Sequence, residues 1–173
     1  MKASISTTLL LLLVPTLTGA QTPLHPAPYP SVDPVLHGNA RWSPVSNTAE
    51  SITGPIETSP GTIRLAGRIV PLNLAHALAG QQLKEAAALF PITPTASTAA
   101  AIYRVSIPAS LALKNKNTIC GKQTATWLVL INTDADLDLA VFSGPSQPNL
   151  TPAVVSNSTS LCGTLIYTAA APH

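Results

Sequence analysis

Charged side chains are scarce in this sequence, and that scarcity limits the partners that the protein can bind. Asp, Glu, Lys and Arg make up 9% of the 173 residues, with nine basic residues against seven acidic ones. The basic residues are scattered along the chain instead of forming a cluster. Since binding to phosphates requires a concentrated basic face, the composition argues against nucleic acid as a partner.

Motifs of common catalytic sites are missing as well. The chain has no G-x-S-x-G elbow, no H-E-x-x-H helix, no G-x-x-x-x-G-K phosphate loop and no dinucleotide-binding G-x-G-x-x-G. None of the four histidines has a carboxylate at the spacing of a known motif. The sequence therefore predicts no catalytic residue and no cofactor, and it favours a protein without enzymatic activity.

Cysteine is nearly absent, since Cys120 and Cys162 are the only two in the chain. Two cysteines without neighbouring histidines cannot complete a tetrahedral zinc site, so we expect no metal there. An even number of cysteines in an exported chain favours a disulfide. A bridge closing a loop of this length would stabilise the fold by about 4 kcal/mol.

The apolar run LLLLLVPTL near the N-terminus is too short to span a bilayer, and it follows the positive charge of Lys2. Thr18 and Ala20 place small residues at the −3 and −1 positions of a cleavage site before Gln21. We predict that residues 1–20 are a signal peptide and that the protein is periplasmic or secreted. No later stretch is long and apolar enough for a membrane anchor, so no transmembrane segment is expected after cleavage.

Prolines dominate the segment after the predicted signal peptide. Residues 21–38 contain five prolines, which lack a backbone donor and so cannot enter a regular ladder. We predict a mobile, proline-rich leader over residues 21–40 and a single β-rich domain over residues 41–173. A proline-rich recognition peptide is the alternative interpretation of the leader.

Short apolar alternations separated by turn residues fill most of the remaining sequence. The clearest runs are AIYRVSI at 101–107, TATWLVLIN at 124–132, LDLAVFSG at 137–144 and GTLIYTA at 163–169. Their β-branched and aromatic residues favour strands, and the lack of helices between them favours antiparallel pairing. The expected fold is mainly β, a small antiparallel sheet or partly closed barrel of about six to eight strands with one short helix.

Two local patterns give finer predictions. In SPGTIRLAGRIVPL, Gly67 allows a tight reversal between two strands, and Pro71 places the second strand at a sheet edge or at its own end. Residues 81–90 are rich in strong helix formers, so the short helix is predicted there, with Pro91 as its stop.

The run NTDADLD raises the question of a metal site. Its D-x-D-x-D spacing opens like a calcium loop, but Leu139 stands where that loop needs glycine and Pro145 where it needs glutamate. We therefore predict a hairpin turn around Asp134 and Asp136. Asp138 is predicted to be an outward residue of a half-exposed strand.

Three residues in two of the predicted strands are the candidate ligand-facing residues. Arg104 follows Tyr103 in a predicted strand, where it either faces inward, stacks on an aromatic ring or screens a sheet edge. Trp127 belongs to a strand with apolar residues on both faces, which is typical of a central, buried strand. The candidate set is thus Tyr103, Arg104 and Trp127.

The runs IYRV, NKNTICG, TWLVLINTDADLDLAVFSGP and LCGTLIYT resemble small exported proteins of proteobacteria to which no activity is assigned. The resemblance spans residues 50–169 and depends on the paired Cys-Gly motifs and on LAVFSG. It implies no ligand and no catalytic residue. A looser similarity, in size, β content and a single disulfide, is to periplasmic lysozyme inhibitors, whose inhibitory loop motif is missing here.

These features favour a non-catalytic binding or inhibitory module of the periplasm, with an unknown protein or small ligand as its partner. One alternative is a carboxylate-dependent hydrolase in which Glu50, Glu57 and Asp138 converge only in the folded chain. A second alternative is a structural protein of the cell envelope.

Overall fold

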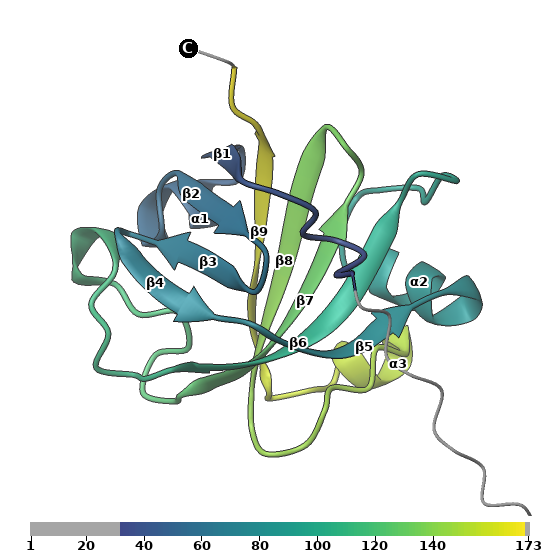
Figure 1. Cartoon of the computed structure of the whole chain (residues 1–173). Coiled ribbons are helices and arrows are strands. Elements are labelled where there is room, and N and C mark those ends of the chain that lie inside the picture. The colour runs from purple at the N-terminus through teal and green to yellow at the C-terminus, as the bar shows by residue number, and fades with distance from the viewer. Residues whose placement is uncertain (1–31, 172–173) are drawn as a thin grey trace, which may run out of the picture.

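The computed structural model describes residues 32–171, so the predicted signal peptide and much of the predicted leader lie outside the described residues. In this part of the chain, nine antiparallel strands form one sheet in the order β4-β3-β2-β1-β9-β8-β7-β6-β5 (Figure 1). The mainly β fold class is confirmed, with one strand more than the upper end of the expected range. The strands are β1 (Ala40–Pro44), β2 (Ile56–Ser59), β3 (Thr62–Leu65), β4 (Arg68–Pro71), β5 (Asn73–Leu78), β6 (Ala99–Ile107), β7 (Ala125–Asn132), β8 (Asp136–Ser143) and β9 (Leu161–Ala169).

The two edges of this sheet are formed by one continuous stretch of chain. Strand β4 ends at Pro71 and β5 begins at Asn73, so Leu72 alone separates them. Because this stretch supplies both edges, the sheet curls back towards itself, and the result is a nearly closed barrel in which β4 and β5 do not pair (Figure 1). Register shifts in the pairings from β5 to β9 mark irregularities that bend these strands.

Three short helices and one turn of 3-10 helix connect the strands in the described residues. They are α1 (Asn47–Ile52), α2 (Gly80–Ala87), α3 (Pro152–Val155) and the 3-10 turn η1 (Lys114–Lys116). Helix α2 packs on β5, β6 and β7 and is the helix that the sequence predicts, but it ends three residues early. The chain tightens there, because the amides of Leu89 and Phe90 donate to carbonyls only three residues back.

The long strands bury side chains on both faces of the sheet. In β7, Leu128 and Leu130 point into the barrel, whereas Trp127, Val129 and Ile131 point to the outer face. All five are at most 6% exposed, which confirms the prediction of a central strand buried on both sides. The outer cluster is completed by apolar side chains from α2 and from the turn that follows it.

The domain begins earlier in the chain than the sequence indicates. Val35 and Leu36, which the predicted leader includes, are 1% and 3% exposed and pack in the interior core. Their amides donate to the carboxylate of Asp33, at 2.9 and 3.0 Å. These two residues of the predicted leader therefore contribute to the core of the domain. Residues 21–31 of the predicted leader lie outside the described residues.

The predicted disulfide between Cys120 and Cys162 is confirmed, with 4.9 Å between the two Cα atoms. Cys162 lies in β9, but Cys120 lies in the loop before β7 and not in a strand. The bond therefore fastens the long connection between β6 and β7 to the middle of the sheet.

Candidate functional site

The sheet separates the three candidate ligand-facing residues. Tyr103 points into the barrel, where it is 0% exposed and its hydroxyl donates to Asp33 Oδ1 at 2.6 Å. Burial, reinforced by the Asp33 carboxylate, raises the pKa of Tyr103 far above its usual value. Arg104 and Trp127 lie opposite each other on the outer face. Tyr103 therefore does not share a surface with the other two.

Arg104 and Trp127 form a stacked pair. The guanidinium carbon lies 5.2 Å from the centroid of the indole ring, a distance typical of a cation–π contact. The ring is only 6% exposed, and its Nε1 has no hydrogen-bond partner among the described residues. The arginine covers the face of the tryptophan ring, so little aromatic surface is left for a ligand. The pair is therefore better suited to stabilising the outer cluster.

A different set of charged residues gathers on the outer face of the short strands. Arg41 in β1 lies opposite Glu57 in β2, Glu57 lies opposite Arg64 in β3, and Arg64 lies opposite Ile69 in β4. Directly opposite residues in a sheet project from the same face. The four side chains therefore form one row across four neighbouring strands.

The carboxylate of Glu57 holds both arginines of this row. Its Oε1 lies 3.3 Å from Nε of Arg41 and its Oε2 lies 3.1 Å from Nε of Arg64. Both arginines use their inner nitrogen for this contact, and Nη1 of Arg64 also donates to the carbonyl of Gly67 at 3.3 Å. Other guanidinium nitrogens remain without a partner in residues 32–171. The row has two positive charges against one negative charge.

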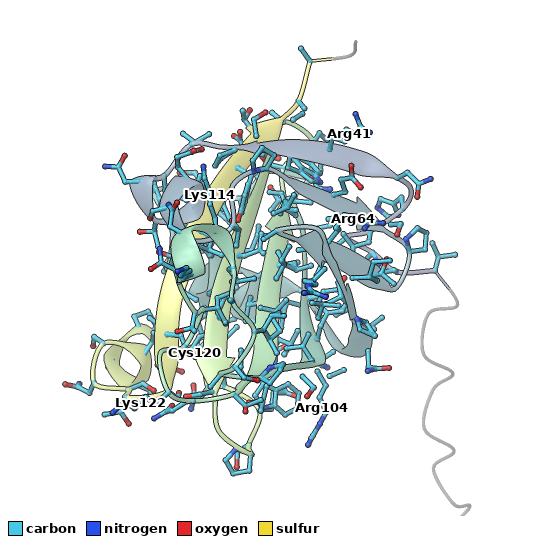
Figure 2. The ribbon with its side chains drawn as sticks, turned by 90° about the vertical axis from the view of Figure 1, so that its left-hand side faces the viewer. Arg41, Arg64, Arg104, Lys114, Cys120 and Lys122 are labelled. Carbon is cyan, nitrogen blue, oxygen red and sulfur yellow. A yellow bond between two sulfur atoms is a disulfide. The ribbon has the colours of Figure 1, made fainter. Side chains whose placement is uncertain are left out.

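A hollow of about 560 Å³ accompanies this row, and we call it the arginine groove. It is lined by Asn39, Ala40, Arg41, Glu57, Thr58, Ser59, Thr62, Arg64 and Ile69. Figure 2 shows Arg41 and Arg64 in the upper part of the molecule, well away from Arg104 and Lys122 at its lower edge. The candidate surface is therefore distinct from the stacked pair of Arg104 and Trp127.

The sequence alone does not reveal this groove. The alternation in TIRL already indicates that Arg64 points away from Ile63 and Leu65, so one half of the signal was present. The strand register that places Arg41 and Arg64 on either side of Glu57 cannot be read from the sequence. Residues so far apart along the chain give no spacing motif. Only the pairing of β1, β2 and β3 brings them together.

Asp138 is a buried carboxylate on the outer face of β8. Its outward direction was predicted, but its half-exposed position was wrong, because the residue is 1% exposed and its cross-strand neighbours are Ile131 and Ile166. Neither carboxylate oxygen has a hydrogen-bond partner among the described residues. Burial first, and the charge of Asp136 second, raise the pKa of Asp138 to about 6.

The acidic residues proposed for a hydrolase lie apart from one another. Glu50 is paired with Lys114, and Glu57 is held between the two arginines. Asp138 on β8 is separated from Glu57 on β2 by β9 and β1. Three strand spacings amount to ~14 Å along the sheet, beyond the separation of carboxyl groups in glycosidases. Residues 32–171 also contain no group of three or more His, Cys, Asp or Glu that could hold a metal ion.

Comparisons with known proteins add no further constraint. No family model, curated protein or solved structure matches the chain. Among residues 32–171, no helix combines the length and the apolar character needed to cross a bilayer.

Proposed function

We propose that this protein is an exported, non-catalytic binding module whose arginine groove holds an anionic ligand. The observation that carries the proposal is the way in which Glu57 contacts both Arg41 and Arg64 through their Nε atoms. A guanidinium held in this way keeps its orientation. The outer nitrogens of Arg41 and Nη2 of Arg64 stay available, whereas Nη1 of Arg64 donates to the carbonyl of Gly67. Arginine in such a position suits carboxylate, sulfate or phosphate groups, because it offers two parallel donors.

The exposure of the row supports a role in binding rather than in stability. The side chains of Arg41, Glu57 and Arg64 are 69%, 45% and 44% exposed. Ion pairs at this exposure contribute at most about 1 kcal/mol to folding, because water and salt screen them. The fold does not depend on this cluster, yet three charged side chains border one hollow.

Export is supported by the disulfide and by the N-terminal sequence. The bond between Cys120 and Cys162 is compatible with an oxidising compartment such as the periplasm or the extracellular medium. The resemblance to small exported proteobacterial proteins, proposed from the sequence, points to the same location. A binding role is preferred to catalysis because the carboxylates that a hydrolase would need lie apart from one another.

Calorimetric titration with a panel of polyanions tests the proposal. The exported protein would be titrated with polygalacturonate, polyphosphate and polyglutamate, and with neutral dextran. We expect at least one polyanion to bind, dextran not to bind, and the affinity to fall as salt is raised. The double variant Arg41→Ala/Arg64→Ala should lose about tenfold or more in affinity, because hydrogen bonds to charged groups contribute about 1.5–3 kcal/mol each.

The matched control removes two positive charges elsewhere. Lys84 and Lys122 are exposed and lie outside the arginine groove, so Lys84→Ala/Lys122→Ala changes the net charge equally. This variant should keep the affinity of the native protein within about twofold, a difference of about 0.4 kcal/mol. Equal losses in the two double variants, or no binding to any of the three polyanions, would reject the arginine groove as the binding site.

A further inference from the structure

From the shape and lining of the groove we infer that its ligand is a linear acidic polysaccharide that runs across strands β1 to β4 and reaches the free edge of β4. The inference rests on the proposed function and specifies the class of ligand. Three features support it: a second hollow that continues the first, the direction of the arginine row, and the hydroxyl and amide groups along the path.

A second hollow, of about 450 Å³, adjoins the arginine groove. It is lined by Arg64, Gly67, Arg68, Ile69, Val70, Pro71, Ser106, Pro108 and Leu111. Arg64 and Ile69 line both hollows, so the two meet at these side chains. Ile69 is 60% exposed and stands at the junction. A ligand that uses both hollows must pass this residue, which favours a chain over a compact molecule.

The cations follow the same path. Strands in a sheet are about 4.8 Å apart, so the backbone positions of Arg41 and Arg64, two strands from each other, are ~10 Å apart. Arg68, at the start of β4, also lines the second hollow, although its position opposite Leu65 places it on the other face of the sheet from Arg64. Glu57 is the acidic residue among those that line the two hollows. The outer row thus has two positive charges against one, with Arg68 at the border of the second hollow, and the path suits a ligand with repeated negative groups.

The direction of this path distinguishes a saccharide from a peptide. A peptide that extends a sheet lies alongside an edge strand and gains affinity from main-chain hydrogen bonds. The arginine row crosses the strands instead, so a peptide bound along it would leave its backbone groups without a strand to pair with. A polysaccharide has no such requirement.

The walls of the path offer partners for sugar hydroxyls. Ser59 and Thr62 present hydroxyls that lie 2.6 Å apart, and Asn39 adds a side-chain amide in the same hollow. Ser106 supplies a hydroxyl in the second hollow. The segment at residues 21–31 of this chain is not a suitable occupant, because it has four prolines and no acidic residue. The observed lining therefore favours a chain that alternates carboxylate and hydroxyl groups.

Titration with oligogalacturonates of one, two, four and eight residues tests the inference. The affinity should rise with chain length and level off once the chain spans both hollows. Arg68→Ala should weaken the octamer by about threefold or more and leave the monomer and dimer unchanged. Ile69→Glu, which places a negative charge at the exposed junction beside Arg64, should weaken all four oligomers, and the octamer most, because a longer chain must also pass this residue.

The outcomes separate this inference from the function on which it depends. If the affinity per chain does not depend on length, or if Arg68→Ala and Ile69→Glu bind the octamer like the native protein, the inference is wrong. It is also wrong if polyglutamate of matched charge binds as tightly as the octamer. In each of these cases, a loss of binding in Arg41→Ala/Arg64→Ala would still support the arginine groove as an anion site.

Discussion

The outer faces of the two halves of this barrel differ in polarity and in what covers them. The outer face of the long strands β5 to β8 is apolar and is covered by α2, the turn after it and the loop before α3. The outer face of β1 to β4 has no such cluster, and it presents the row formed by Arg41, Glu57, Arg64 and Ile69. The covered half stabilises the fold on both sides of the sheet, which leaves the uncovered half free to contact a ligand.

Truncation of an apolar side chain in each half should show the largest contrast. Leu130→Ala in β7 removes a side chain that is 0% exposed, and we expect a loss of about 2–5 kcal/mol in the free energy of unfolding. Ile69→Ala in β4 removes one that is 60% exposed, and its effect should stay within about 0.5 kcal/mol. Urea denaturation measures both. Similar losses in the two variants would mean that the halves do not differ in the way described.

Asp138, the buried acidic residue of the covered half, should make the free energy of unfolding depend on pH. Its folded-state pKa is about 6 against an ordinary 3.8, so between these values Asp138 is still protonated when folded and is ionised when unfolded. The contribution of Asp138 to the free energy of unfolding is therefore most favourable below pH 4. It decreases as the pH rises to 6, by roughly 3 kcal/mol in total.

The comparison of native protein with Asp138→Asn isolates this contribution from the other carboxylates. Urea denaturation between pH 4 and pH 8 should show the native protein losing stability relative to the variant as the pH rises, with no further change above pH 7. A constant difference across this range would show that Asp138 is not buried as a carboxylic acid.

Glu57, the acidic residue of the uncovered half, should affect the free energy of unfolding less than Asp138 does. Its charged form should stabilise the fold, whereas the charged form of Asp138 destabilises it. Glu57→Gln removes both ion pairs with Arg41 and Arg64, and the stability should fall by no more than about 1 kcal/mol because the pairs are exposed. The loss should shrink further in 1 M salt. A loss of several kcal/mol, measured by the same denaturation assay, would indicate that the row is part of the stabilising core.

Alternation within the strands predicted the fold well, because burial imposes a period of two on every strand. The turn at Gly67, the edge position of β4 and the doubly buried β7 followed from local patterns. Exposure was harder to predict. Asp138 obeys the alternation, but the sequence does not reveal that both of its neighbours across the sheet are isoleucines.

The candidate site was predicted less well than the fold, for a related reason. The sequence pointed to Tyr103, Arg104 and Trp127 as aromatic and basic residues of predicted strands. Tyr103 and Arg104 are adjacent in a strand and therefore face opposite sides of the sheet, so only Arg104 and Trp127 share a face. Arg41 and Arg64 are distant in sequence, and only the register with Glu57 brings them together.

Amide chemical-shift mapping by NMR, with a saturating acidic oligosaccharide such as octagalacturonate, tests the central claim most directly. If the uncovered half is the binding surface, the shifts should be confined to β1 to β4 and to the end of β6 at Ser106 with the loop that follows it, and the rest of the covered strands should be unchanged. Shifts centred on Arg104 and Trp127, or on the strands beneath α2, would contradict the account and move the binding surface to the other half of the barrel.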